Sequence, residues 1–202
     1  MASKTKQAQD AADRVAEADL AVAEAFAPYE DTLAVRAVSI VAKLGDQPPL
    51  RALCGAAIAV GLLRGDDRLA KAGLRALAAH TLATMAKNAI KRRIDRTRPY
   101  VAVEESGDSN GNGKGDGGHK PSPRRDESKE ETSFPSGHSA GAAAVAAAFA
   151  RDYPEHRGIA AAAGAAIALA QIPRCAHYPT DVGGGVALGL AAEAITGRLL
   201  RQ

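Results

Sequence analysis

Two short motifs in the second half of the chain place a histidine beside groups that could orient it or bind an anion. His177 precedes Asp181 by four residues, and a carboxylate near one imidazole nitrogen fixes the tautomer and leaves the other nitrogen free to attack. His138 follows Ser136 and Gly137 at the start of an alanine-rich segment. Free N–H groups at a helix N-terminus bind anions, and a histidine there could protonate a leaving group.

Each motif also has a purely structural interpretation. Ser136 is a preferred helix-capping residue, so the Pro-Ser-Gly-His motif could do no more than begin a helix. A histidine four residues before an aspartate is common by chance, and it is compatible with a helix cap beside a buried histidine. Taken one at a time, the motifs leave both interpretations open.

A third cluster is basic and has the sequence KRRIDRTRP over residues 91–99. Its cations end a predicted helix, where positive charge is favourable, so a solvated end or an anchor to lipid headgroups is one interpretation. The other is a phosphate site, in which Arg98 binds phosphate through two parallel hydrogen bonds and Lys91 acts as a point charge.

The three motifs occur in the order Lys-x6-Arg-Pro, Pro-Ser-Gly-His and His-x3-Asp. If the apolar helices alternate in direction, all three motifs lie at the same end of the helices. This combination resembles the type-2 phosphatidic acid phosphatase family over about residues 50–200. The resemblance implies a phosphatase that uses no metal or other cofactor and acts on a lipid phosphate at a membrane.

The resemblance also implies a role for each motif residue. His177 would become phosphorylated, Asp181 would orient it, and His138 would protonate the leaving oxygen. The residues that would hold the phosphate are Lys91, Arg98, Ser136 and Gly137.

One position departs from the family pattern. The third motif of the family has an arginine six residues before the nucleophilic histidine, and this chain has Gln171 there. Arg174 lies three residues before the histidine and is a candidate phosphate ligand that supplies the missing cation from the next helical turn. The alternative is a phosphate site with one cation fewer.

The composition indicates how these residues are positioned. The chain has 202 residues, of which 46% are hydrophobic but only 3% aromatic, so alanine and glycine supply much of the apolar content. A β-sandwich is disfavoured, because β-branched and aromatic residues suit strands. We therefore predict an all-α fold, a bundle of about five apolar helices preceded by N-terminal amphipathic helices. The predicted helices occupy residues 5–28, 31–44, 50–63, 69–90, 133–150, 158–172 and 182–200.

Two regions follow from this pattern. Residues 1–48 form a charged, amphipathic helical region, and residues 49–202 form the phosphatase domain. Within that domain, residues 104–132 contain almost no apolar side chains and many turn formers. Such a segment cannot bury enough surface to order itself, so it is predicted to be a disordered polar loop.

Hydropathy leaves the membrane setting open. The first thirty residues have no apolar core typical of a signal peptide, and the uncharged runs are mostly shorter than the ~18 to 20 residues of a spanning helix. Basic links fall on one side of an alternating five-helix arrangement, which favours an integral membrane protein whose site faces away from the cytoplasm. A soluble alanine-rich bundle is the alternative.

These observations predict a metal-independent phosphatase that hydrolyses a phosphomonoester or diphosphate through a phosphohistidine. The expected substrate is a lipid phosphate or an isoprenoid diphosphate, and the net charge of +3 is too small to indicate a nucleic-acid partner. The first alternative is a catalytically silent membrane protein that binds lipid phosphate. The second is a vanadium-dependent haloperoxidase, because vanadate mimics phosphate.

Overall fold

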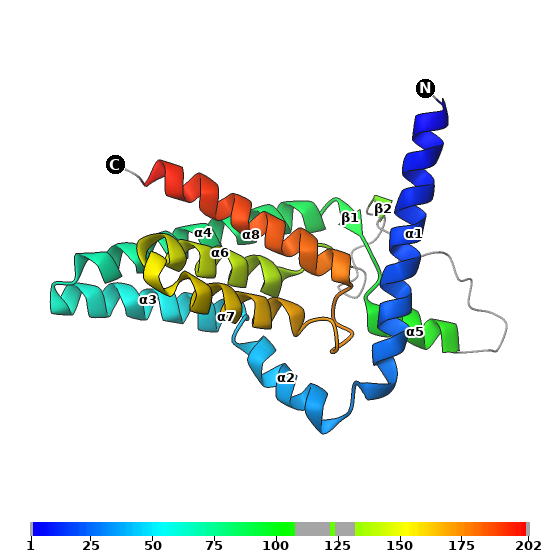
Figure 1. The fold of residues 1–202 in the computed structure, drawn as a ribbon, viewed down its shortest axis with the longest axis horizontal. Helices are drawn as coiled ribbons and strands as arrows, with labels where there is room; N and C mark the ends of the chain where they lie inside the picture. The colour runs from blue at the N-terminus through cyan, green and yellow to red at the C-terminus, as the bar shows by residue number, and fades with distance from the viewer. Residues whose placement is uncertain (1, 108–121, 124–131, 201–202) are drawn as a thin grey trace.

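The protein is mostly helical in the computed structural model, which describes residues 2–107, 122–123 and 132–200 (Figure 1). The α-helices are α1 (Ala2–Phe26), α2 (Leu33–Lys43), α3 (Gln47–Arg64), α4 (Asp67–Lys91), α5 (Pro99–Gly107), α6 (Gly137–Asp152), α7 (Arg157–Leu169) and α8 (Pro179–Leu199). Shorter elements are the 3-10 turns η1 (Ala27–Tyr29) and η3 (Pro154–His156) and the antiparallel strand pair β1 (Ile94–Asp95) and β2 (Ser122–Pro123). The helical content confirms the predicted fold class.

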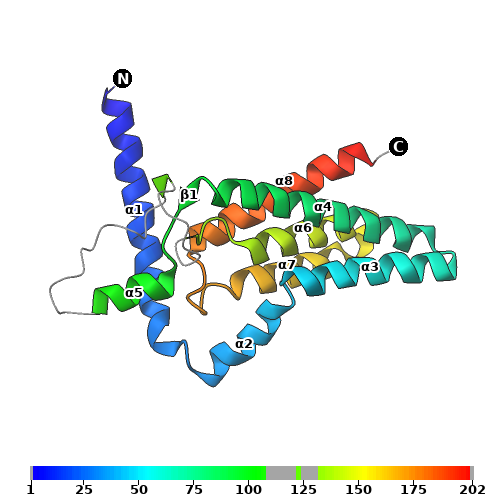
Figure 2. The same ribbon diagram turned by 180° about the vertical axis from the view of Figure 1, so that it is seen from behind.

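Five helices, α3, α4, α6, α7 and α8, form a bundle with α6 at its centre. Helices α4, α7 and α8 pack against α6, and α3 packs beside α4 (Figures 1 and 2). The core is built from small side chains, namely Cys54, Ala76, Ala79, Ala83, Ala140, Ala144, Ala148 and Ala192. Helix α8 lies so close to α6 that a Cβ at Gly189 would be 2.3 Å from the carbonyl oxygen of Ala140. The abundant alanine and glycine residues therefore allow the helices to pack closely.

Local sequence signals set the helix ends that matter for the site. Ser136 caps α6 with its hydroxyl oxygen, which accepts the N–H of Ser139. At the start of α8, the Asp181 carboxylate accepts the N–H of Tyr178 at 3.0 Å. At the far end of the bundle, Gly65 ends α3 in a left-handed conformation with φ of 66°. Capping thus places the second and third motifs at two neighbouring helix starts.

The largest corrections to the predicted boundaries concern the helix at residue 133 and the loop at 104–132, while the starts predicted at 50 and 182 each lie three residues earlier, at Gln47 and Pro179. The helix predicted to begin at residue 133 begins at Gly137, because Ser136 is its cap and not part of its first turn. The predicted loop 104–132 is partly ordered, since residues 104–107 belong to α5 and Ser122–Pro123 pair with β1. These segments gain backbone partners that composition does not reveal. Residues 108–121 and 124–131 of that predicted loop lie outside the described residues.

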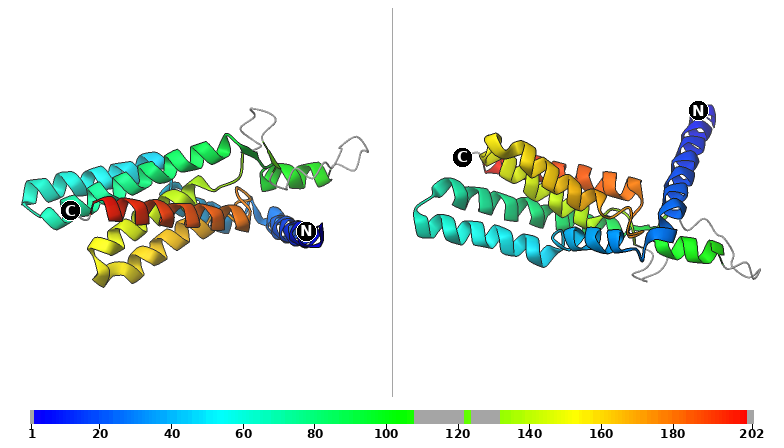
Figure 3. Two further views of the ribbon diagram at one scale, coloured as in Figure 1. Left: turned by 90° about the horizontal axis from the view of Figure 1, so that it is seen from above. Right: turned by 60° about the horizontal axis from the view of Figure 1, so that its bottom comes forward.

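The N-terminal helices lie at one end of the bundle. Helix α1 stands across this end and contacts α5 and α8, whereas α2 leads back to α3 and contacts α7 (Figures 1 and 3). The N-terminal region is therefore placed against the end of the bundle where α4 ends and where α6 and α8 begin.

The outer surface of the helices carries many large apolar side chains. Examples with more than half of their surface exposed are Leu33, Ile40, Leu53, Leu62, Leu63, Leu74, Ile159 and Leu199. In the part of the chain that the structure describes, no helix has both the length and the apolar character needed to cross a membrane.

Candidate active site

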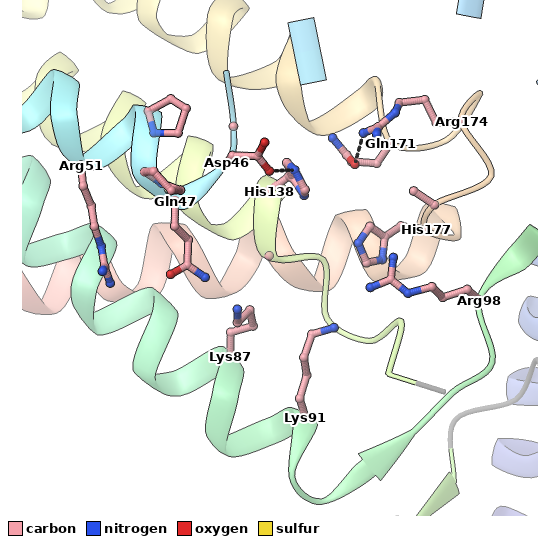
Figure 4. A pocket seen from close by; sticks show the side chains of 15 residues that line it. Asp46, Gln47, Arg51, Lys87, Lys91, Arg98, His138, Gln171, Arg174 and His177 are labelled. Atoms are coloured by element: carbon pink, nitrogen blue, oxygen red, sulfur yellow. Dashed lines mark hydrogen bonds and ion pairs between the residues drawn. The ribbon is translucent and has the colours of Figure 1, made fainter. Parts of the chain in front are cut away.

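A cavity of about 830 Å³ opens where α4 ends and where α6 and α8 begin (Figure 4). All three sequence motifs contribute to its wall, through Lys91, Arg98, Gly137, His138, Arg174 and His177. Further polar side chains in the wall are Asp46, Gln47, Arg51, Lys87 and Gln171. Among the described residues, no group of His, Cys, Asp and Glu side chains is arranged as a metal site. The charged side chains of the cavity wall are mainly cationic, and two histidines lie among them.

His177 is the buried histidine of the cavity. Its Nδ1 faces the Asp181 carboxylate, with 3.8 Å between Nδ1 and Oδ2, which is longer than a hydrogen bond. Burial lowers the pKa of His177 to about 4; Asp181 opposes this shift, and Arg98 and Lys91 add to it. The imidazole is therefore neutral at pH 7 and has a lone pair available for attack.

Asp181 is held by Arg96, a buried arginine of the basic cluster 91–99. Arg96 donates to Oδ1 of Asp181 at 2.6 Å and to Oδ2 of Asp19 at 2.7 Å, and its guanidinium lies 4.2 Å from the ring centre of Tyr178. Burial alone would raise the pKa of Asp181, but His177, Arg96 and the Tyr178 N–H together lower it. Asp181 thus stays ionised beside His177.

Asp19 brings the N-terminal helix into the site. It lies in α1, is buried, and also accepts the N–H of Thr180 at 3.2 Å. Sequence reasoning missed it, because it is one carboxylate among many charged residues in an alanine-rich helix. No local signal distinguishes it from its neighbours.

His138 is paired with a second aspartate that sequence reasoning missed. The distance between His138 Nε2 and Asp46 Oδ1 is 2.7 Å (Figure 4). Burial lowers the pKa of His138, the Asp46 carboxylate opposes this, and Arg174 and Arg98 reinforce it. Asp46 immediately precedes α3, and its place before Gln47-Pro48-Pro49 marks it as a helix cap but not as a partner of a histidine.

The second motif meets the cavity through Gly137 and not through Ser136. Gly137 is the first residue of α6 and lines the cavity. Ser136 is fully buried, and its hydroxyl accepts the N–H and the hydroxyl of Ser139. The structure therefore gives Ser136 the capping role, and its predicted contact with phosphate gains no support from the geometry of the cavity.

Gln171 stands where the family pattern has an arginine, and Arg174 lies beside it in the structure. Both residues line the cavity, and Arg174 Nη1 donates to Gln171 Oε1 at 3.1 Å (Figure 4). Gln171 is buried, and its own amide nitrogen donates to the carbonyl of Ile167 at 3.1 Å. The glutamine thus holds the guanidinium at the cavity wall, which supports the expectation that Arg174 supplies the missing cation.

We expect Arg174→Ala to lower kcat/KM strongly, because a fixed phosphate contact is worth about 2 to 4 kcal/mol in the transition state. Gln171→Ala removes only the hydrogen bond that orients Arg174, so about 1 kcal/mol should be lost. Steady-state kinetics of both variants on one substrate test this order. If kcat/KM is unchanged in Arg174→Ala and rises strongly in Gln171→Arg, the proposed phosphate site lacks a cation at this position.

Two of the predicted phosphate ligands, Lys91 and Arg98, come from the end of α4 and the segment that follows it. Lys91 ends α4 and hydrogen-bonds the carbonyl of Thr132, and Arg98 lies beside His177 (Figure 4). Within the described part of the chain, no carboxylate forms an ion pair with the Arg98 side chain. Arg98 is therefore available to an anion bound at His177.

The helical bundle brings a lysine, an arginine and two histidines together around one cavity. They come from the end of α4 and from near the starts of α5, α6 and α8, and this is the arrangement that the family resemblance implies. The model of the PAP2 superfamily matches residues 72–201, so the chain belongs to the PAP2 superfamily. This match confirms the resemblance stated from the motifs.

The fold is also similar to a solved structure, that of the first transmembrane PAP2 type phosphatidylglycerolphosphate phosphatase from Bacillus subtilis. The TM-score is 0.59 at 22% sequence identity, over 92% of this chain and 86% of that chain. None of the curated proteins matches the chain. At this identity, the likeness is one of fold.

Proposed function

We propose that the protein is a metal-independent phosphatase that hydrolyses a phosphomonoester or a diphosphate of a membrane lipid through a phosphohistidine. The observation that carries the proposal is the position of a neutral, buried His177 beside Arg98 in a cationic cavity. The family and the phosphatase fold of the Bacillus subtilis protein support the same reaction class.

In the proposed mechanism, His177 attacks phosphorus with Nε2, because its Nδ1 faces Asp181. A nitrogen–phosphorus bond forms, the bond from phosphorus to the leaving oxygen breaks, and His138 protonates that oxygen. Water then attacks the phosphohistidine, with His138 as the base, and inorganic phosphate leaves. The charge of the transferring phosphoryl group is stabilised by Lys91, Arg98, Arg174 and the start of α6 at Gly137.

The direct test is phosphate release by the purified protein. Phosphatidic acid and farnesyl diphosphate in detergent micelles serve as substrates, with and without a chelator. Release that is unaffected by the chelator supports the proposal. Binding of either lipid without any turnover would instead identify a silent lipid-phosphate-binding protein, and vanadate-dependent halide oxidation without hydrolysis would identify a haloperoxidase.

We expect Asp46→Asn to narrow the pH range of activity. Asp46 raises the pKa of His138 against the effect of burial, so its loss should lower that pKa further. Because the acid must be protonated before it can donate, the alkaline limb of kcat/KM should move to lower pH. A pH series on an alkyl phosphate measures the limb. The same series on p-nitrophenyl phosphate is the control, since its leaving group needs little protonation.

We further propose that the bundle is an integral membrane protein whose site faces away from the cytoplasm. The embedded parts would be the uncharged runs 52–63, 76–86, 139–150, 158–170 and 182–192. The exposed leucines and isoleucines of the outer surface support this, because large apolar patches are rare on soluble monomers. Some of the charges at the far end are paired with one another, for example Arg68 with Glu155 at 2.7 Å.

Cysteine labelling in intact cells tests this arrangement. Arg92→Cys lies at the site end and should react with a membrane-impermeant reagent, whereas Asp67→Cys lies at the far end and should react only after lysis. The native Cys54 and Cys175 are buried, which keeps the background low. Extraction of the wild-type protein without detergent would contradict the membrane proposal.

A further inference from the structure

Two cations of the cavity take no part in the mechanism above. Arg51 comes from α3, and Lys87 comes from α4 one helical turn before Lys91. In Figure 4 both lie on the other side of Lys91 from His177. Within the described ranges, neither side chain forms an ion pair with a carboxylate.

Lys87 lies on the side of the cavity where the leaving oxygen is protonated. A Cβ built at Gly137 would be 3.1 Å from Cδ and 3.5 Å from Nζ of Lys87. The lysine is therefore packed against the residue that precedes His138, and the absence of a side chain at Gly137 makes room for it.

The charges of the cavity do not balance for a single phosphate. Its wall carries five cationic side chains, namely Arg51, Lys87, Lys91, Arg98 and Arg174, against one carboxylate, that of Asp46. One phosphate brings a charge of about −2, so roughly two positive charges stay uncompensated.

The two unused cations also repel each other. Burial, followed by the charge of Arg51, lowers the pKa of Lys87. Two like charges without a counter-ion are unfavourable in the free protein, and an anionic group bound between them would relieve the repulsion. The geometry therefore favours a ligand that brings a second anionic group to this side of the cavity.

We propose that Arg51 and Lys87 form a second phosphate subsite on the leaving-group side, which makes an organic diphosphate the preferred substrate. This inference rests on the phosphatase function proposed above. His177 attacks the terminal phosphorus, and the bond from that phosphorus to the bridging oxygen breaks. The bridging oxygen keeps the electron pair and takes the proton of His138. The leaving group is then an organic monophosphate, which Arg51 and Lys87 hold.

The test compares a diphosphate and a monophosphate of the same alcohol. Farnesyl diphosphate and farnesyl phosphate are hydrolysed by wild type, Lys87→Ala and Arg51→Ala. Each variant should lose about 10- to 100-fold in kcat/KM on the diphosphate, the value of a charged hydrogen bond. On the monophosphate, each should lose less than about threefold. Lys87→Arg should keep the preference, and Lys71→Ala, an exposed lysine on the same helix, is the matched control.

Each other outcome has a distinct meaning. Equal losses on both substrates, or a wild-type preference for farnesyl phosphate, would overturn the second subsite while leaving the phosphatase function intact. No hydrolysis of either substrate by wild type would overturn the proposed function itself. Phosphatidylglycerol phosphate, in which glycerol separates the two phosphates, is a third substrate. If only this lipid loses rate in the variants, the subsite holds a distant phosphodiester and the diphosphate preference is wrong.

Discussion

Replacing His177 with alanine should abolish turnover and the formation of acid-labile phosphoenzyme. We expect a loss of at least about 10⁴-fold, as for removal of a covalent nucleophile. Among the described residues of the cavity wall, the one other histidine is His138, and it is paired with Asp46. Rapid-quench labelling with ³²P-labelled substrate measures the intermediate directly. Hydrolysis at the wild-type rate in this variant would contradict the mechanism.

The control for this prediction is His138→Ala. This variant loses the leaving-group acid but keeps the nucleophile, so p-nitrophenyl phosphate should still label it. Because His138 is also the proposed base for water, the phosphoenzyme should accumulate instead of disappearing. A labelled His138 variant beside an unlabelled His177 variant separates the two roles.

The pH dependence of the wild type follows from the same residue. Burial, which is opposed by Asp181, lowers the pKa of His177 to about 4. The attacking imidazole must be neutral, so kcat/KM should fall only as the pH drops through about 4, and not near 6.5 as for an exposed histidine.

Removal of Arg96 should have the largest effect on stability. Its guanidinium is almost completely buried between the carboxylates of Asp19 and Asp181, at 2.7 and 2.6 Å. Arg96→Met leaves two buried carboxylates without their cation, which costs about 3 to 5 kcal/mol. For a chain of this size the loss corresponds to a fall of roughly 6 to 20 °C in Tm. Thermal unfolding followed by circular dichroism measures it.

Two variants show whether Arg96 also positions His177 and Asp181, the proposed catalytic pair. Arg93→Ala removes an exposed arginine of the same basic segment and should change neither Tm nor activity. Asp19→Asn keeps the contact between Arg96 and Asp181 and should lower kcat more than it changes KM, because α1 no longer braces the arginine. An Arg96→Met variant as stable as Arg93→Ala would contradict the buried network.

Much of the proposed catalytic pair and of the proposed phosphate site could be predicted from local sequence. His177 and Asp181 lie on either side of a helix start, His138 follows the Ser136 cap, and Lys91 ends a helix. These positions depend on capping and on helical periodicity, which act over a few residues. The family resemblance then joined the three motifs into one predicted site, and Lys91, Arg98, Gly137, His138, Arg174 and His177 line one cavity in the structure.

The partners of these residues were decided by tertiary structure. Asp46 meets His138 across 92 positions of the sequence, and Asp19 meets Arg96 across 77. Nothing in the spacing of a single helix predicts such a contact, because it depends on how α1 and α3 are packed against the bundle. Lys87 lies four residues before Lys91 and could have been placed on the same helix face. That it meets Arg51 in one cavity, however, follows only from the pairing of α3 with α4.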